Sequence, residues 1–447
     1  MDKDSLTEDE MEEIIFRPLI GSGRGFYGTF AILLVIISIG IYAYYVQLSE
    51  GLAVTGMWDI VIWGLYITNF VFFIGISHAG TLISAILRLT KAEWRRPITR
   101  MAEAITVFAL VIGASMIIVD MGRPDRLHHI LLFGRMQSAI LWDFISIATY
   151  ISGSIIYLYL PMIPDLARCK EKLKNVSPWR MKLYSVLSLN WKATEEQKKR
   201  LERGIGIMAV LIVPIAVSVH TVVSWIFGMT SRAGWHSTIF GPYFVVGAIF
   251  SGIASIIIAM AILRKVYGLE HFLTPRHFQY LGLMLLTLNI AYMYFTVSEY
   301  LTSGYVGMEG EAELLEAIFG GSYALYFWTF VIGGLVIPAF ILAIPRTRTI
   351  TGVVFASVLV NIGMWIKRFI ITVPALARPQ IGMMWGSYVP TWVEWSITAG
   401  ALAGFAFLFL LFTKIFPIIS VWEVSEAPAA DEHVSEEVLI SAETSEQ

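Results

Sequence analysis

Charged residues and cysteine are scarce in this sequence. Only 15% of the 447 residues are charged and 57% are hydrophobic, and the mean hydropathy of +0.70 excludes an ordinary soluble domain. The single cysteine, Cys169, lies in a lysine-rich stretch, so this chain is expected to hold neither a disulfide framework nor a cysteine-ligated zinc or iron–sulfur centre. The net charge is −2 and no basic patch is interleaved with aromatic residues, which disfavours nucleic acid as a partner. These scarcities predict an integral membrane protein.

Long apolar runs recur along the chain. A transmembrane helix needs about 20 mostly apolar residues, and ten runs meet that length. They lie at Phe26–Leu48, Asp59–Leu89, Ile98–Met121, Ser138–Ile163, Gly204–Met229, Phe240–Val266, Pro275–Thr302, Ser322–Pro345, Ile350–Pro374 and Pro390–Phe416. The expected fold is an all-α integral membrane protein with ten transmembrane helices.

The second and sixth runs resemble each other weakly. Aligned, they match at four positions: Tyr66, Phe73, Gly75 and Ile76 fall on Tyr243, Phe250, Gly252 and Ile253. Four identities between apolar helices also arise by chance, so an internal duplication is one alternative and coincidence the other. We expect two four-helix bundles, residues 59–229 and 240–374, and two peripheral helices at 26–48 and 390–416.

The distribution of lysine and arginine predicts the orientation. Of the 32 basic residues, 25 lie in the N-terminal segment, the loops after the second, fourth, sixth and eighth runs, or the tail, and five lie on the opposite side. The positive-inside rule therefore places both termini in the cytoplasm. The expected location is the cell membrane, with the chain crossing it many times.

Three polar segments complete the expected layout. Residues 1–25 form a cytoplasmic segment that lacks the basic-then-apolar order of a cleavable signal. The loop 164–203 carries eleven basic residues and is expected to be a solvated cytoplasmic helix on the lipid headgroups. Residues 423–447 are rich in Ala, Glu and Ser and are expected to be a disordered tail.

The run at 59–89 carries a polar stripe. At helical spacing, one face holds Ser77, His78, Thr81, Ser84 and Arg88. Inside a membrane such a stripe must face protein or water. Small residues such as Gly75 and Gly80 let neighbouring helices come close. We therefore expect this run to form the inner wall of a helix bundle.

Ionisable side chains inside the membrane are costly to bury, so each is a functional candidate. Depth, counted at about 1.5 Å per residue, separates them into two sets. The set nearer the outer side is Asp120, Arg123, Asp143, His220, Glu299, Lys367, Arg368 and Glu394. The set nearer the cytoplasm is His78 and Glu103, which with Thr81 and Ser84 make an inward polar line.

Structural roles compete with functional ones at these positions. Asp120 with Arg123, and Arg368 with Glu299 or Glu394, would also serve as ion pairs that lock helices together.

The structural alternative for His220 is a core histidine that is hydrogen-bonded to nearby hydroxyl groups. Asp143 has a stronger functional case, because it stands about one turn inside its span, within reach of the outer surface. Trp142 lies beside it and would wall off lipid.

The two intramembrane histidines bear on haem binding. A b-type haem in a membrane needs two histidines that face each other at similar depth. His78 lies about nineteen residues from the outer end of its span and His220 about nine, an offset of roughly 15 Å at helical rise. The sequence therefore predicts no axial pair, and no haem in this chain.

Five motifs carry a family resemblance: Gly75–Arg88 (GISHAGTLISAILR), Leu141–Asp143 (LWD), Ser218–Trp225 (SVHTVVSW), Tyr294–Tyr300 (YFTVSEY) and Met384–Glu394 (MWGSYVPTWVE). They resemble the polysulfide-reductase membrane-subunit family (NrfD/PsrC-like), and the resemblance covers nearly all of 26–416. The ten-span layout is most similar to the larger quinol-binding subunit of alternative complex III.

The resemblance implies a quinol-binding subunit of a respiratory oxidoreductase that carries no redox cofactor of its own. Menaquinone or ubiquinone would bind near the outer face of the first bundle. The implied partners are an outer-side iron–sulfur or molybdopterin-like subunit, a multihaem cytochrome c and a homologous membrane subunit. Electron transfer to the partner, with a contribution to proton translocation, is the implied role.

By the same resemblance, Asp143, His78 and His220 act at the quinol pocket. The implied pocket lining is Trp63, Tyr66, Trp142, Asp120 and Arg123. The implied proton route is Glu103, Thr81, Ser84, Glu299, Arg368 and Glu394. The family often has an acid before the arginine of the ninth span, where this chain has Lys367, and that departure puts a route through the second bundle in doubt.

Two other functions compete. A membrane anchor of a molybdopterin-type complex of the polysulfide or dimethyl sulfoxide reductase kind would share the family but need no quinone site. A secondary transporter also combines repeated bundles with intramembrane charges. Against a transporter, no pair of runs is clearly interrupted by Gly or Pro at mid-membrane, and the charges gather near the outer end.

Overall fold

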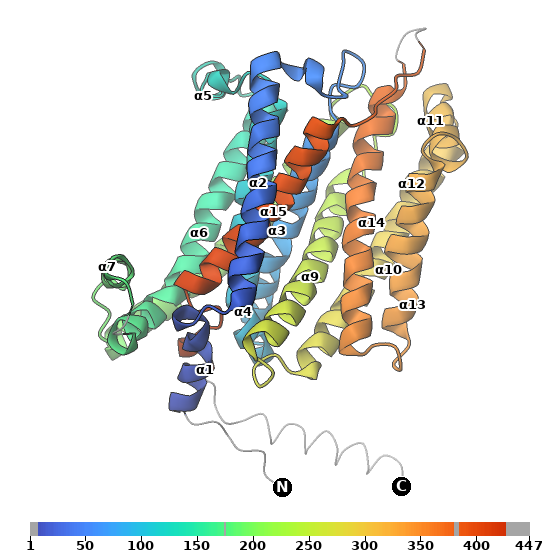
Figure 1. Ribbon diagram of the computed structural model, residues 1–447. Coiled ribbons are helices and arrows are strands. Elements are labelled where there is room, and N and C mark those ends of the chain that lie inside the picture. The colour runs from blue at the N-terminus through green and yellow to red at the C-terminus, as the bar shows by residue number, and fades with distance from the viewer. Residues whose placement is uncertain (1–7, 174–175, 380–383, 426–447) are drawn as a thin grey trace, which may run out of the picture.

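The computed structural model describes residues 8–173, 176–379 and 384–425. Within these ranges the chain forms helices joined by loops, and the long helices run side by side (Figure 1). Ten helical stretches of the described chain are long and apolar enough to cross a membrane, which confirms the ten-span, all-α prediction.

The spans are helices of 20 to 34 residues. They are α2 (Arg24–Glu50), α3 (Leu65–Leu89), α4 (Arg96–Asp120), α6 (Ala139–Lys172), α8 (Glu195–Gly228), α9 (Phe240–Tyr267), α10 (Pro275–Val306), α14 (Ile350–Ala377), α15 (Trp392–Ile415), and one built from α12 (Ala324–Trp328), the π-helical η4 (Thr329–Val336) and α13 (Ile337–Ala343). The shorter helices are α1 (Glu8–Ile20), α5 (His129–Phe133), α7 (Pro178–Leu187), α11 (Glu309–Phe319) and α16 (Val421–Ser425), with 3₁₀ turns at Leu52–Val54, Glu93–Arg95 and Pro124–Arg126.

The spans pack as two groups of four with a pair at the side. The first group is α3, α4, α6 and α8, and the second is α9, α10, α14 and the α12–α13 span. The pair, α2 and α15, pack along each other (Figure 1). A Cβ atom on Gly40 of α2 would lie 3.0 Å from the Cα of Gly400 on α15, so glycine at both positions lets the two backbones touch.

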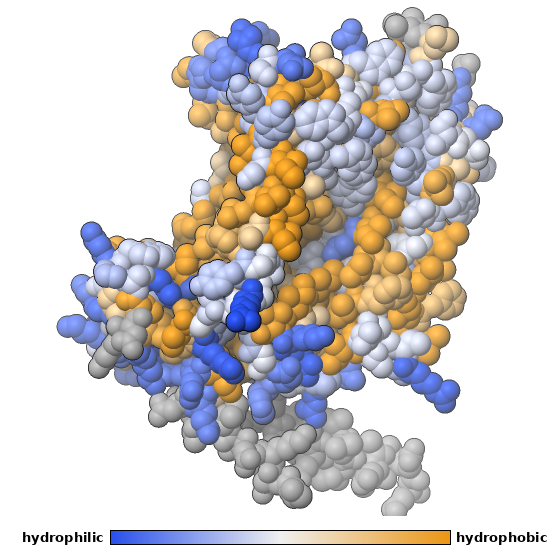
Figure 2. Space-filling model, in the orientation of Figure 1, coloured by the Kyte–Doolittle hydropathy of each residue, from blue (hydrophilic) through white to orange (hydrophobic). Residues whose placement is uncertain are grey.

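The molecule has polar ends and an apolar middle. Figure 2 shows hydrophobic residues over the middle of the helices and hydrophilic residues toward both ends. Helices α1 and α7 lie at one end, called here the α1 end, and α5 and α11 lie at the other, the α11 end (Figure 1). Helix α16 contacts α1, so the first and last described helices share an end, as ten crossings require. The cytoplasmic location of that end stays a prediction.

Helix α3 is the inner wall between the two groups. It contacts α4 and α8 on one side and α9 and α14 on the other, and most of its described side chains are buried. A Cβ on Gly80 would come within 1.8 Å of the carbonyl oxygen of Ala102 on α4, and Gly75 faces Ser251 of α9. The predicted wall, with small residues at its close contacts, is confirmed.

Some element boundaries differ from the sequence-based expectation. Helix α3 begins at Leu65 rather than Asp59, because the preceding loop bonds to the loop before α15: the Leu65 N–H donates to the Tyr388 hydroxyl at 2.8 Å. Helices α6 and α8 both extend into the predicted loop 164–203, which also contains α7. The tail segment 423–425 is helical in α16, and the remainder of the predicted disordered tail lies outside the described residues.

Candidate functional site

The two intramembrane histidines are in contact. His78 on α3 and His220 on α8 have no exposed surface, and Nδ1 of His220 lies 2.9 Å from Nε2 of His78. The same His78 nitrogen lies 2.5 Å from the Ala216 carbonyl oxygen, and its Nδ1 lies 3.0 Å from the Ile74 carbonyl oxygen. A neutral imidazole carries one N–H, so two carbonyls and a second imidazole compete for it. The two imidazoles are therefore linked to each other and to two backbone carbonyls, and their tautomers depend on each other.

The predicted 15 Å depth offset between these histidines is therefore wrong. Six residues of the expected span are loop rather than helix, which removes about 9 Å from the depth assigned to His78. The remainder of the 15 Å offset arises because both depths were counted from helix ends that lie at different depths. The depth offset therefore no longer supports the expectation that the chain holds no haem, and that expectation stays a prediction. No cluster of three or more metal-ligating side chains occurs within the described ranges, which leaves the expected lack of a metal site a prediction too.

Neighbouring helices fix α3 at the level of His78. The carbonyl oxygen of Ser77 accepts hydrogen bonds from the Thr106 hydroxyl of α4 at 2.7 Å and from the Tyr150 hydroxyl of α6 at 3.1 Å. The Tyr150 ring lies 5.0 Å from the His78 ring, centroid to centroid. The imidazole therefore has little freedom to turn.

One ring nitrogen of the histidine pair has no hydrogen-bond partner in the described chain. Nε2 of His220 is buried and has no hydrogen-bond partner among the described residues, and the same holds for Nη2 of Arg368 on α14. Arg368 interacts electrostatically with His220 across the boundary between the two groups. Its guanidinium lies over the Phe244 ring at 5.0 Å, in space that Gly247 leaves free. Buried polar atoms normally have hydrogen-bond partners, so these two atoms are candidates for bonding a further polar group at the boundary between the two helix groups.

Asp143 lies in the first turns of α6 at the α11 end. It is 4% exposed, and its Oδ1 has no partner in the described part of the chain. Trp142 beside it is half-buried and donates from Nε1 to the Met136 carbonyl oxygen at 2.5 Å. Asp143 is therefore a buried carboxylate near the end of its span, and its accessibility from the outer surface stays a prediction.

Tyr66, Asp120 and Glu394 form a separate cluster between α3, α4 and α15. The Tyr66 hydroxyl donates to the side-chain oxygen of Gln47 at 2.6 Å, and the Gln47 amide donates to the Val119 carbonyl at 2.8 Å. Glu394 accepts from the Gly56 N–H at 2.7 Å and from the Tyr388 hydroxyl. Burial first, and then Glu394, raises the pKa of Tyr388, so Tyr388 stays a neutral donor.

The ion pairs offered as structural alternatives are not found among the described residues. Arg123 pairs with Asp125 at 3.1 Å, on the surface, rather than with Asp120. The Arg368 guanidinium has neither Glu299 nor Glu394 as a salt-bridge partner within the described ranges.

The inward polar line is partly assembled. The Ser84 hydroxyl of α3 donates to Oε1 of Glu103 on α4 at 2.7 Å and lies 3.2 Å from the Tyr157 hydroxyl of α6. Oε2 of Glu103 is buried without a partner in the described chain. The side chain of Thr81 lies outside the described residues.

Trp63 belongs to an aromatic cluster rather than to the histidine pair. Its ring stacks on Trp235 at 6.0 Å and meets Phe227 edge-on at 5.8 Å. The Trp235 indole in turn donates to the Ile371 carbonyl of α14 at 2.7 Å. This cluster closes the boundary between the two groups toward the α11 end.

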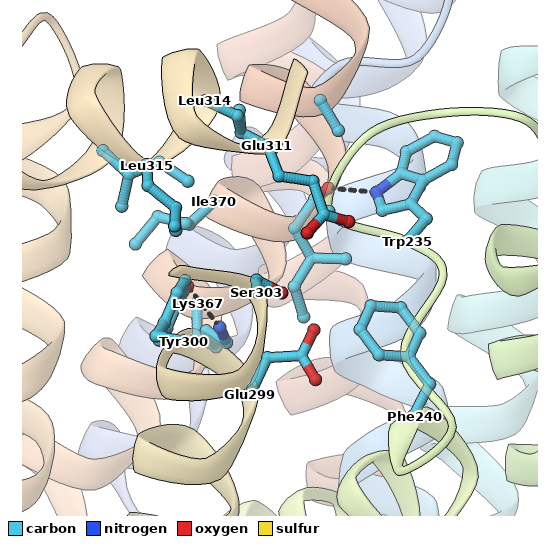
Figure 3. Close-up of a pocket in the computed structure, with 14 residues that line it drawn as sticks. Trp235, Phe240, Glu299, Tyr300, Ser303, Glu311, Leu314, Leu315, Lys367 and Ile370 are labelled. Atoms are coloured by element: carbon cyan, nitrogen blue, oxygen red, sulfur yellow. Dashed lines mark hydrogen bonds between the residues drawn. The ribbon is translucent and has the colours of Figure 1, made fainter. Parts of the chain in front are cut away.

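A pocket opens in the second group toward the α11 end, away from the histidine pair. Figure 3 shows the carboxylates of Glu299 on α10 and Glu311 on α11 pointing into it, with Lys367 and Tyr300 at one side. The Lys367 ammonium donates to the Tyr300 hydroxyl at 2.8 Å and lies over three aromatic rings, those of Tyr300, Tyr243 and Phe330, at 4.6 to 5.5 Å. The position that departs from the family pattern is therefore a buried cation in an aromatic box.

Sequence reasoning missed several polar residues because their partners are distant in the chain. Arg100 of α4 and Asp165 of α6 form a fully buried pair at 2.6 Å, and Asp165 also accepts from the Trp422 N–H at the start of α16. Glu423 then pairs with Arg88 at 2.8 Å and Arg95 at 3.4 Å. Asp165 falls inside an apolar helix that continues past its predicted end, and that continuation is the signal that would have found it.

The fold and these groups define a helical membrane protein whose interior holds ionisable side chains on several spans. The chain belongs to the family described as polysulphide reductase, NrfD, which matches residues 53–380. This confirms the resemblance drawn from the motifs at the level of the family.

Curated relatives align over most of their length. The chain is 28% identical to a putative dimethyl sulfoxide reductase membrane subunit of Halobacterium salinarum, with 90% of this chain and 94% of the relative covered. It is 25% identical to a selenate reductase subunit of Mesobacillus selenatarsenatis, at 88% and 94% coverage. It is 23% identical to the Hdr-like menaquinol oxidoreductase integral membrane subunit of Archaeoglobus fulgidus, at 92% and 98% coverage.

Proposed function

We propose that this chain is the membrane subunit of an oxidoreductase complex and binds a quinone or quinol in the first group of helices. The observation that carries the proposal is that two buried polar atoms of this group, Nε2 of His220 and Oδ1 of Asp143, each have no hydrogen-bond partner in the described chain. Buried polar atoms are normally hydrogen-bonded, and a quinone carbonyl or quinol hydroxyl has the matching chemistry. The family and a relative named for menaquinol support the same class of ligand.

The protein's own groups would handle the protons. A bound quinol supplies two electrons and two protons to the site. Asp143 accepts a proton near the α11 end. His220 accepts one at Nε2 and can release the proton on its Nδ1 toward Nε2 of His78, 2.9 Å away. A carboxylate and an imidazole are ordinary general bases, and proton transfer to such a group contributes about 10²–10⁴-fold in rate.

The electrons would leave through a partner. The proposed partner is an iron–sulfur or molybdopterin-like subunit docked at the α11 end, which we take to be the outer side of the cell membrane with both termini in the cytoplasm. A multihaem cytochrome c and a homologous membrane subunit would complete an assembly like alternative complex III. The chain itself is expected to show no haem or iron–sulfur signal when isolated.

The chain would also contribute to proton translocation. In the first group, Ser84 and Glu103 continue from the histidine pair toward the α1 end. In the second group, Glu299 is buried at the pocket, and Arg368 is buried at the boundary with the first group, where it interacts with His220. Lys367 stands where the family often has an acidic residue. A proton route through the second group would therefore use the amine of Lys367 and the hydroxyl of Tyr300, which are hydrogen-bonded to each other.

A second candidate is favoured by two of the relatives. The names dimethyl sulfoxide reductase membrane subunit and selenate reductase subunit belong to complexes that reduce a terminal acceptor. In such a complex this chain would anchor a molybdopterin-type catalytic subunit. Genes for that subunit beside this one would favour the second candidate over an alternative complex III-like assembly.

The test replaces Asp143 by Asn, which keeps the size and removes the proton acceptor. The complex is purified, and its yield, its bound quinone and its quinol-dependent turnover are measured in one preparation. We expect normal yield and a loss of turnover of about 10²–10⁴-fold. Asp125→Asn, an exposed carboxylate at the same end, is the matched control and should keep full turnover.

Three results would contradict the proposal. Full turnover in a normally assembled Asp143→Asn complex would remove Asp143 from the reaction. Poor assembly with normal turnover per assembled complex would make Asp143 a structural carboxylate. Absence of any extractable quinone from the active wild-type complex would remove the quinone itself.

A further inference from the structure

We propose that the pocket of the second group binds a small monovalent metal cation between the carboxylates of Glu299 and Glu311. The site is distinct from the histidine pair and from the proposed quinone position. It lies where α10, α11 and α14 meet, at the α11 end (Figures 1 and 3).

The first support is an unpartnered carboxylate oxygen aimed into a cavity. Glu299 is only 5% exposed and its Oε2 has no hydrogen-bond partner in the described chain. Figure 3 shows that carboxylate pointing into the pocket toward Glu311. Ser237 hydrogen-bonds to the Glu299 carboxylate, which leaves Oε2 as the oxygen without a partner. A buried carboxylate oxygen without a partner is costly, and a cation would satisfy it.

The second support is the set of oxygen donors that line the same space. Ser303 follows Glu299 by one helical turn, so its hydroxyl lies on the same face of α10 and also lines the pocket. Glu311 supplies a second carboxylate from a different helix, and Glu299 interacts with it electrostatically. Two carboxylates and a hydroxyl are hard oxygen ligands of the kind that alkali and alkaline-earth ions prefer.

The charge of the pocket selects a monovalent ion. Lys367 is the one cation that lines it in the described chain. Its ammonium donates to Tyr300, lies in the aromatic box and attracts the Glu299 carboxylate without a salt-bridge contact. Arg378, close to α11, is already paired with Glu313 at 3.0 Å. Glu299 and Lys367 interact and offset each other's charge, so Glu311 leaves one formal negative charge in the pocket. A monovalent cation neutralises it, whereas a divalent ion would leave a net positive charge in a poorly solvated place.

Helix α11 makes the site accessible. It is the short helix after α10, and its Glu311 is partly exposed while Leu314 is buried against the pocket. A cation would therefore enter from the α11 end past Glu311 and reach Glu299 behind it.

The experiment uses the intact purified complex. Its thermal unfolding midpoint is measured in sodium, potassium, lithium, calcium and choline chloride at equal ionic strength. We expect a saturable rise with at least one alkali ion that choline does not give, because a ligand that binds only the folded state stabilises it. Glu299→Gln and Glu311→Gln should each weaken the apparent affinity about tenfold or more, the usual size of a lost charged contact.

Glu316→Gln is the matched control, since Glu316 lies on the same helix, is exposed and does not line the pocket. It should leave the alkali response unchanged. The proposal would be overturned if choline raised the unfolding midpoint as much as the alkali ions do. It would also be overturned if Glu316→Gln weakened the apparent affinity as much as Glu299→Gln and Glu311→Gln do. Saturation by calcium without any alkali response would overturn the monovalent assignment. Should Glu299→Gln fail to assemble, Glu311→Gln at the partly exposed entrance and Ser303→Ala carry the test.

Discussion

His220 and His78 share a hydrogen bond although they are 142 residues apart, on two different helices. Their ring centroids are 3.8 Å apart, and His220 keeps its second nitrogen free of partners in the described chain. One imidazole is therefore tied to the backbone of α3 and α8, and the other can bond to a ligand. This division of roles is what a site needs if one group receives a proton and the next takes it away.

Replacement of His220 by Gln tests this division. Glutamine keeps a polar group near His78 but cannot take up a proton at neutral pH. We expect a normal yield of complex and quinol-dependent turnover lower by about 10²–10⁴-fold. His128→Gln, an exposed histidine at the α11 end, should behave as the wild type.

The alternative for His220 is a purely structural core histidine. In that case the variant would lower the yield or the unfolding temperature, and the complex that does assemble would turn over normally. Measurement of turnover per assembled complex separates the two outcomes.

The sequence was sufficient to predict the architecture because hydropathy acts locally. Each span is a continuous apolar run, and residues such as Gly80 and Ser84 already mark the packed face of α3. The polar stripe also predicted that His78 faces protein, which its full burial confirms.

The neighbours of these residues were not predictable in the same way. Depth counting failed for His78 and His220 because a loop bonded to Tyr388 shortens α3, and that bond spans 323 residues of sequence. The aromatic box of Lys367 draws its rings from three helices besides its own. Such contacts depend on how helices are placed against one another, which apolar periodicity does not encode.

The Arg100–Asp165 pair predicts a large effect on stability. Both side chains are essentially unexposed, at 1% and 0%, and Arg100 also donates to the Pro161 carbonyl at 2.9 Å. Loss of one partner leaves a buried charge, which costs about 3–5 kcal/mol. We therefore expect Asp165→Asn to lower the yield and the unfolding temperature of the complex strongly.

Two variants serve as controls for that prediction. Asp125→Asn breaks an exposed pair and should change stability little, since water already solvates both groups. The double variant Arg100→Met with Asp165→Leu removes both charges and should recover much of the loss. A mild effect of Asp165→Asn alone would show that the pair is not desolvated.

Gly80 predicts a packing defect. A methyl group there would lie 1.8 Å from the Ala102 carbonyl and 2.2 Å from the Thr106 hydroxyl oxygen, so α3 and α4 would have to separate. Because Thr106 bonds to the Ser77 carbonyl beside His78, Gly80→Ala should reduce both assembly and turnover. Gly206→Ala on α8, where nothing lies within 4 Å, should be neutral or slightly stabilising by helix propensity. Equal behaviour of the two variants would contradict the close contact.

The last prediction concerns topology. The predicted 25-to-5 division of basic residues places the α1 end in the cytoplasm. Ser49 lies at the end of α2 and Phe416 directly after α15, and these two helices pack along each other. An odd number of crossings, nine, separates the two points within the described chain, so they lie on opposite sides of the membrane.

Alkaline phosphatase fused after Ser49 should be active, because that enzyme requires export, and the same reporter after Phe416 should be inactive. A fluorescent reporter that folds only in the cytoplasm should give the reverse pattern. Activity of the phosphatase at Phe416 and not at Ser49 would invert the orientation, and the proposed partner would then dock on the cytoplasmic side. The same result at both positions would contradict the number of spans.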